Sequence, residues 1–264
     1  MATFTAKDVQ TLRQATGAGM MDAKRALTEN DGDFQAATKW LREKGLAKAA
    51  TRSDRANEQG AVASVVDGSV AAVVELKSET DFSAKAADFT AVVDELVAAV
   101  AADGESAVER LADKVDHLKV TKKENIEVGR VVRWEVPAGH VLDSYLHIQD
   151  GRGVNAVLVE LDGGSPELAH DIAVHIAFTK PEYLRREEVP ADEVERERAT
   201  LADITRAEGK PEAALDKIVE GRLTGWYKER VLLEQGFVRD EKTTIAQMLG
   251  DVALVRFAQV VIGG

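Results

Sequence analysis

The sequence predicts an α+β protein in which a small helical bundle precedes a core of strands and helices. Three observations support this fold class. Residues 1–45 have helical periodicity, two pairs of strand-like runs each surround an Asp-Gly turn and lead into a helix, and residues 190–224 resemble a pair of charged helices. With 264 residues, the chain is long enough for more than one domain.

The first helix of residues 1–45 is expected to begin after Thr5. Thr5 is the expected N-cap, and Asp8, three residues later, completes a variant of the capping box. Val9 and Leu12 then form the apolar face of this helix.

Two further helices are expected before residue 46. In "GAGMMDAKRALTEN" the apolar positions Met20, Ala23 and Leu27 recur at helical spacing. In "DGDFQAATKWLREKG" Asp33 is the expected N-cap and Gly45 the expected end of the helix. The apolar stripe of this third helix consists of Phe34, Ala37, Trp40 and Leu41. The polar and basic segment 46–59 is expected to be a linker.

Residues 60–102 and 145–178 share one order of elements and indicate an internal duplication. In each segment two strand-like runs flank Asp-Gly, which is a strong hairpin signal, and the second run ends in Val-Glu-Leu before a helix. Glu75 and Glu160 occupy equivalent positions in the two segments. We therefore expect two related subdomains, each a β-hairpin followed by a helix; because the repeat is faint, chance similarity is the alternative.

Residues 190–224 predict an antiparallel helical hairpin that is broken at "EGKPE". Its apolar positions are Val194, Leu201 and Ile204 on one arm and Leu215, Ile218, Val219 and Leu223 on the other. The arms are short for an independent coiled coil, so the hairpin is expected to lean on a neighbouring element. The final segment, "ALVRFAQVVIGG", resembles a strand.

Composition and charge exclude several classes of protein. The absence of cysteine excludes disulfides, thiolate catalysts and zinc–cysteine sites, and favours the reducing cytoplasm. No run of about 18 apolar residues predicts a membrane span, and the N-terminus lacks the pattern of a secretory signal. The formal net charge of −12 disfavours direct contact with nucleic acid, so a protein or a small molecule is the expected partner.

The sequence contains no positive sign of catalysis. "GAGMMD" lacks the third glycine of a dinucleotide-binding motif, and "GRGVNA" leads into a strand, so a hairpin turn explains it better. There is no P-loop and no nucleophile elbow. His170 and His175 are five residues apart, which does not suit a shared metal on a helix, so they are expected to be surface or packed histidines. We expect no cofactor and no metal; an enzyme with an unrecognised acidic site is the alternative.

The segment "SETDFSAK", residues 78–85, places the aromatic ring of Phe82 beside Asp81 at the end of a strand. Phe82 could pack as a hydrophobic staple on the following helix, with Asp81 as its N-cap. Alternatively, the ring points outward into a partner. The local pattern alone favours the staple.

Two segments, "TLRQATGAGMMDAKRAL" (11–27) and "VELKSETDFSAK" (74–85), resemble the signature segments of the bacterial elongation factor Ts family. "WLREKG", "HIAFTKPEYL" and "KIVEGRL" resemble further segments of that family in the same order. The resemblance covers nearly the whole chain. Lys77 and Ser83 depart from the residues usual at their positions, and the C-terminal helical module of some members looks shortened or absent.

The resemblance implies a division of the chain into a helical domain and a core. Residues 1–45 would form a three-helix, ubiquitin-associated-like domain, followed by the linker 46–59. Residues 60–140 would form the N-subdomain of the core, and residues 141–264 its C-subdomain, with the helical hairpin inserted at about 190–224.

The resemblance also implies a function, because members of the family are guanine-nucleotide exchange factors for elongation factor Tu and catalyse no covalent chemistry. By this likeness, the loop with Asp81 and Phe82 enters the partner near its bound magnesium, and a second group of residues touches the partner's nucleotide domain around its guanine side. The partner-binding residues implied in this way are Arg13, Met20, Met21, Thr80, Asp81, Phe82 and His147. The expected partner is elongation factor Tu in its GDP-bound or nucleotide-free form. The hairpin could form a homodimer or heterotetramer, touch the partner or only pack on its own core, and a structural adaptor is the remaining alternative.

Overall fold

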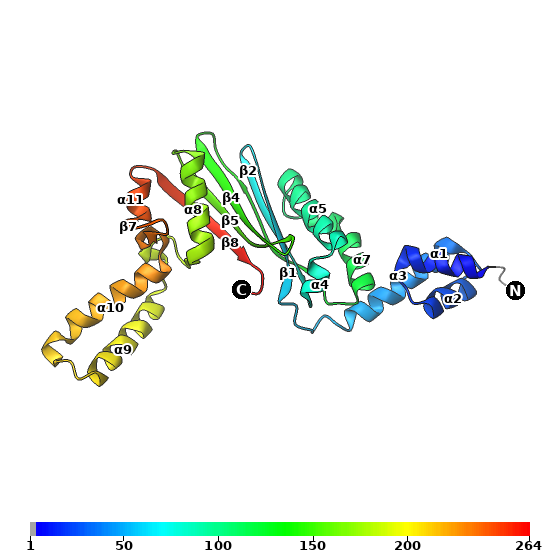
Figure 1. Ribbon diagram of the computed structural model, residues 1–264, viewed down its shortest axis with the longest axis horizontal. Helices are drawn as coiled ribbons and strands as arrows, with labels where there is room; N and C mark the ends of the chain where they lie inside the picture. Colours follow the sequence, from blue (N-terminus) through cyan, green and yellow to red (C-terminus); the bar gives the residue numbers. More distant parts are fainter. Residues whose placement is uncertain (1–3) are drawn as a thin grey trace.

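The computed structural model describes residues 4–264 and combines helices with antiparallel sheets, which confirms the predicted α+β class. The molecule is elongated (Figure 1). Three N-terminal helices lie at one end, two sheets with their covering helices lie in the middle, and a helical hairpin projects from the other end.

The N-terminal helices are α1 (Ala6–Thr16), α2 (Met20–Glu29) and α3 (Phe34–Ala50). The predicted capping box of Thr5 and Asp8 is present, and the side chain of Asp33 caps α3. The three helices enclose a small core made of Val9, Leu12, Ala23, Ala26, Leu27, Ala37 and Leu41. Of the predicted apolar positions, Phe34 is 39% exposed and does not belong to this core.

The predicted end of the third helix at Gly45 is wrong, because α3 continues to Ala50. Gly45 lies where α3 crosses α7 (Ala112–Lys122), and a β-carbon at this position would lie 2.7 Å from Cγ1 of Val120. The glycine therefore permits a close helix–helix contact and does not end the helix. As a consequence, the first five residues of the expected linker are helical.

Two three-stranded antiparallel sheets form the core. The first has the order β1 (Gln59–Asp67), β2 (Val70–Ser78), β3 (Glu127–Glu135), and the second has the order β4 (His140–Gln149), β5 (Arg152–Asp162), β8 (Ala253–Val261). In each sheet a hairpin with an Asp-Gly turn supplies two strands, and a later strand pairs with the second one. This common order confirms the two related hairpin-plus-helix units.

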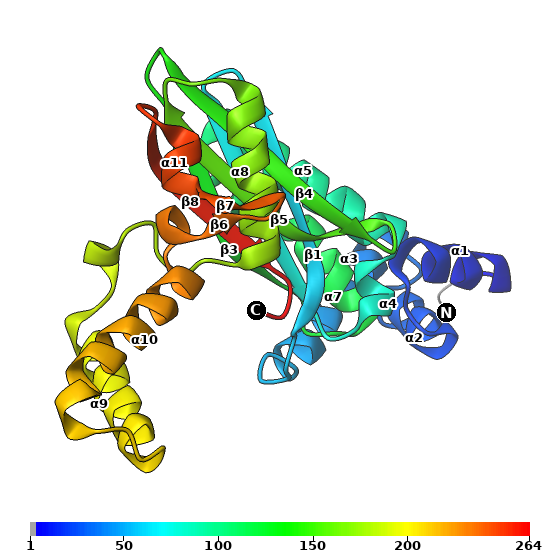
Figure 2. The ribbon, with the colours of Figure 1, turned by 60° about the vertical axis from the view of Figure 1, so that its left-hand side comes forward.

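The two sheets pack face to face between helices, so the core has four layers (Figures 1 and 2). Helix α5 (Ala87–Asp103) covers the outer face of the first sheet, and α8 (Pro166–Thr179) covers that of the second. The inner faces meet through Val62, Ala71, Val73, Trp134, Ala156, Leu158, Ala258 and Val260. The short helices α4 (Asp81–Ala84) and α6 (Ala107–Arg110), with α7, complete the connection from β2 to β3.

The predicted helical hairpin consists of α9 (Ala191–Ala207) and α10 (Leu215–Arg230), so its second arm extends beyond the expected end at residue 224. Its base packs through Val189, Leu223, Trp226 and Val231, while the rest projects from the core (Figure 2). The remaining elements are η1 (Arg186–Glu188), η2 (Glu212–Ala214), η3 (Leu232–Glu234), β6 (Gly236–Phe237), β7 (Asp240–Thr244) and α11 (Ile245–Leu249).

Candidate functional site

The segment that follows β2 directs one aromatic ring into solvent. Thr80 caps α4, because its hydroxyl accepts a hydrogen bond from the N–H of Ser83 at 3.3 Å. Ser83 and Ala84 are buried beneath this turn, whereas Phe82 is 85% exposed. Asp81 is the first helical residue and not the N-cap. The interpretation of Phe82 as a hydrophobic staple with Asp81 as the cap is therefore wrong.

Phe89, and not Phe82, anchors the following helix. Phe89 lies in α5 and is fully buried in the core of the first subdomain. Burial of a phenylalanine side chain contributes about 1.5–3 kcal/mol relative to leaving it in water. The ring of Phe82 makes little of this contribution to the stability of its own chain.

Charged groups from the hairpin of the second sheet hold one side of this loop. Nζ of Lys85 lies 2.7 Å from Oδ2 of Asp81 and 3.1 Å from Oδ2 of Asp150, and Nη1 of Arg152 donates to the carbonyl of Asp81 at 3.2 Å. The hydrogen bond from Lys85 lowers the pKa of Asp81, and the hydrogen bonds to Asp81 and Asp150 raise the pKa of Lys85. The loop of the first subdomain thus rests on the Asp150-Gly151 turn of the second, which is the hairpin turn that the sequence predicted.

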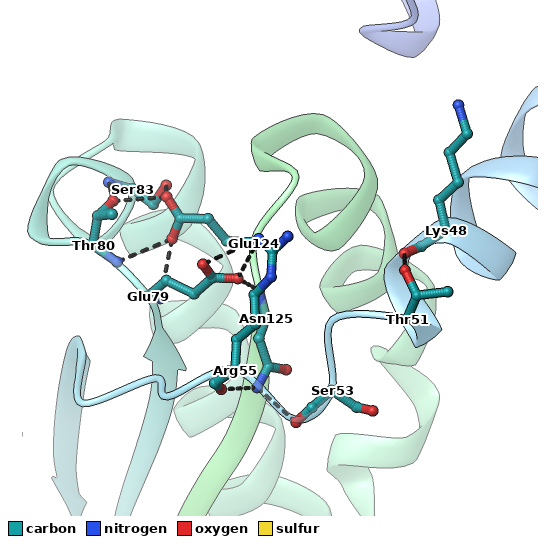
Figure 3. A network of polar contacts seen from close by, with 9 residues as sticks. All are labelled: Lys48, Thr51, Ser53, Arg55, Glu79, Thr80, Ser83, Glu124 and Asn125. Carbon is teal, nitrogen blue, oxygen red and sulfur yellow. Dashed lines mark hydrogen bonds and ion pairs between the residues drawn. The ribbon is translucent and has the colours of Figure 1, made fainter.

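The carboxylate of Glu124, between α7 and β3, holds the other side of the loop (Figure 3). Its Oε2 accepts from the N–H groups of Glu79 and Thr80, both at 3.1 Å. Its Oε1 accepts from the hydroxyls of Thr80 at 2.7 Å and Ser83 at 2.6 Å. Sequence analysis did not identify Glu124, because its partners lie 41 to 45 residues away and no local pattern links them.

His147 lies at the exposed end of β4, three residues before Asp150. It pairs across the strands with Asn155, and its ring stacks on Tyr145 with 6.4 Å between ring centroids. The hydroxyl of Tyr145 lies 3.4 Å from Nδ1 of His147. The fold therefore brings His147 to the same hairpin end that contacts the Phe82 loop.

The other three predicted residues belong to the N-terminal helices α1 and α2, at the end of the molecule opposite the projecting hairpin (Figure 1). Arg13 is exposed near the end of α1, and its carbonyl accepts the N–H of Gly17 at 2.9 Å. Met20 and Met21 open α2 and are 46% and 76% exposed. The expectation that Met20 forms part of the apolar face of this helix is wrong, although Ala23 is fully buried there.

Ile148 and Phe178 are among the exposed large apolar side chains and were not identified from the sequence. Ile148, next to His147, is 55% exposed, and Phe178, near the end of α8, is 79% exposed. Single exposed apolar residues are common in soluble proteins. No local signal separates these two residues from the strand and helix positions that face the core.

No group of three or more His, Asp or Glu side chains within residues 4–264 is arranged to hold a metal ion. His175 is buried, its Nε2 lies 2.9 Å from Oε1 of Gln235, and burial lowers its pKa. His170 lies on the surface, 2.9 Å from Asp143. These are the packed and surface histidines that the sequence predicted. No helix in the described part of the chain is both long and apolar enough to cross a bilayer.

Comparison with known proteins identifies one family. The family model described as "Elongation factor TS" matches residues 79–263. Elongation factor Ts of Renibacterium salmoninarum is 45% identical over 262 residues, which cover 94% of each chain. Elongation factor Ts of Arthrobacter sp. (strain FB24) is 42% identical over 269 residues and 96% of each chain, and that of Clavibacter michiganensis subsp. michiganensis is 45% identical over 261 residues and 94% of each chain.

Proposed function

Because the chain belongs to the elongation factor Ts family, we propose that it is a translation elongation factor that binds elongation factor Tu and promotes the release of GDP from it. It acts as a guanine-nucleotide exchange factor and makes or breaks no covalent bond. The observation that carries this proposal is Phe82, which is 85% exposed on a helical turn that its own chain holds from two sides.

The physical basis of exchange is thermodynamic linkage. An exchange factor binds the nucleotide-free partner more tightly than the GDP-bound partner. Reciprocity then requires that the factor weaken the binding of GDP by the same ratio. The exchange factor therefore needs an apolar or charged group that fits only the nucleotide-free state.

We assign this role to the loop of Asp81 and Phe82, which inserts near the magnesium and phosphate site of the partner. A phenylalanine ring supplies a large apolar contact and loses little conformational entropy when it is buried. Magnesium requires near-ideal octahedral oxygen ligands, so a small displacement of the helices around it weakens its site. The ion belongs to the partner.

The remaining contacts form two groups. Thr80 and His147 belong to the contact around Phe82, where the hydroxyl of Thr80 also fixes the shape of the loop. Arg13, Met20 and Met21 form a second contact with the nucleotide domain on its guanine side. Flexible methionine side chains suit such a surface because they adapt to the shape of a partner.

We further propose that the chain works in the cytoplasm as a three-helix domain that ends with α3 at Ala50, a connecting segment before β1, and two core subdomains (60–140 and 141–264). A homodimer or heterotetramer would form through the hairpin of α9 and α10. Size-exclusion chromatography with light scattering, on the chain alone and with elongation factor Tu, tests this assembly.

The function is tested by stopped-flow release of a fluorescent GDP analogue from elongation factor Tu. A substoichiometric amount of the chain is expected to accelerate release of the analogue from many partner molecules in turn. Tight binding without any acceleration would contradict the proposal and favour a structural adaptor. Turnover of a substrate by the isolated chain would favour an enzyme.

A further inference from the structure

We infer that Glu124 is a positioning residue for exchange: its carboxylate fixes the direction in which the ring of Phe82 leaves the fold. This inference rests on the proposed function and adds to it a residue that acts through the Phe82 loop. Its basis is the geometry of the carboxylate, both of whose oxygens are used by the loop.

Two backbone N–H groups of the loop do not form hydrogen bonds with the neighbouring strand β1. Ser78 is the last residue of β2 in register with β1, where it pairs with Gln59. The N–H groups of Glu79 and Thr80 come directly after this pair and both point to Glu124. Partly buried N–H groups need an acceptor, and a carboxylate forms stronger hydrogen bonds than a neutral group.

The bonds to Glu124 lie on both sides of Phe82 in the sequence. Thr80 is bound by its N–H and its hydroxyl, and Ser83 is bound by its hydroxyl at 2.6 Å. One rigid group thus holds the residues that flank Asp81 and Phe82. Because Ser83 is itself buried, the turn cannot rotate Phe82 inward without breaking these bonds.

The next residue, Asn125, extends the same network to the segment that carries the N-terminal helices (Figure 3). Its N–H donates to Oε1 of Glu79 at 2.6 Å. Its side chain donates to the carbonyls of Ser53 at 3.1 Å and Arg55 at 2.8 Å. Glu124 and Asn125 therefore join the Phe82 loop to the connection between α3 and β1, and so link the two groups of proposed contacts.

The test is the variant Glu124→Gln. An amide keeps the size of the side chain, but its NH₂ group faces two of the four donors and cannot accept from an N–H. At saturating concentrations of the chain, we expect the limiting rate of GDP release to fall about tenfold. The reason is that a misdirected ring of Phe82 no longer fits its binding site on the partner. The concentration of chain at half-saturation should change less than about threefold, because the N-terminal contacts remain.

A second measurement tests the hydrogen bonds between Glu124 and the Phe82 loop in the absence of any partner. In the free chain, the amide hydrogens of Glu79 and Thr80 should exchange about three- to tenfold faster in Glu124→Gln than in the wild-type chain. The matched control is Glu127→Gln, the same change of charge at a residue that hydrogen-bonds to the side chain of Asn57 at 2.8 Å and not to the loop. The amide oxygen of the new side chain can still accept this bond. This control should keep the wild-type rate and the wild-type exchange of both amides.

An unchanged limiting rate in Glu124→Gln, or an equal loss in Glu127→Gln, would overturn the inference. If circular dichroism shows that Glu124→Gln does not fold, Ser83→Ala decides, because it removes a single donor. Its limiting rate should fall about threefold, and a wild-type rate would overturn the inference. A wild-type chain that fails to accelerate release would instead refute the proposed function, while amide exchange would still report whether Glu124 holds the loop.

Discussion

Replacing Phe82 with alanine should abolish most of the exchange activity and leave the fold intact. The side chain is 85% exposed and lies outside the core clusters of the described residues. Its removal should therefore change the free energy of unfolding by less than about 0.5 kcal/mol. Thermal unfolding followed by circular dichroism measures this change.

The expected loss of activity follows from the burial of the ring in the partner. A central aromatic residue of an interface is worth about 2–4 kcal/mol when it is truncated. Since each 1.4 kcal/mol corresponds to a factor of ten, the limiting rate of GDP release should fall about 30- to 1000-fold. Stopped-flow release of a fluorescent GDP analogue at saturating chain measures this rate.

The matched control is Phe34→Ala. Like Phe82, Phe34 is an exposed phenylalanine in the first turn of a helix and follows an aspartate, but it belongs to the N-terminal domain. This variant should keep the wild-type rate. If folded Phe82→Ala accelerates GDP release to within about threefold of the wild-type rate, the proposed insertion of Phe82 into the partner is refuted. Such a loss is too small for a buried aromatic anchor.

Three further predictions concern the fold. Gly45→Ala should lower stability by about 1–3 kcal/mol, because the new methyl group would lie 2.7 Å from Val120. A rise in the melting temperature, as expected when alanine replaces glycine inside an unobstructed helix, would contradict this packing. Burial lowers the pKa of His175, so as the pH falls below 6.5 the unfolded chain binds a proton before the folded chain does. Stability measured by urea unfolding should therefore fall by up to about 1.4 kcal/mol per pH unit, until the pKa of the folded state is reached. His175→Gln should remove this component of the slope, and an unaltered slope would exclude His175 as its source. Glu160→Ala should cost about 2 kcal/mol in chemical denaturation, because the buried carboxylate hydrogen-bonds to the ring of His140 and pairs with Arg256. The exposed Asp162→Ala should cost almost nothing, and equal effects would show that burial is not decisive.

Local signals predicted most of the architecture. The hairpin around Asp150-Gly151, the capping box at Thr5 and the helical hairpin depend on residues that are close in sequence, and all three are present. The strand β3 was not predicted, although it completes the first sheet by pairing with β2. Its partner lies about 60 residues earlier in the chain, so its place in the sheet follows from tertiary structure and not from a local turn.

The features that the sequence did not predict depend on distant contacts. Gly45 has the usual sequence pattern of a helix end, but α3 continues past it, and the close approach of Val120 in α7 explains the need for a glycine there. The direction of Phe82 could not be decided locally, because Phe82 in α4 and Phe89 in α5 are only seven residues apart, and Phe89 takes the buried position. The hydrogen bonds between Glu124 and the Phe82 loop join residues more than 40 positions apart in the sequence, so no local pattern predicted them.

The most direct test of the account is a crystal or cryo-electron structure of the chain bound to nucleotide-free elongation factor Tu. The account predicts that the ring of Phe82 lies between side chains of the partner's nucleotide domain, next to the emptied magnesium site. A ring that remains in solvent in that complex, or that packs against its own chain, would contradict it.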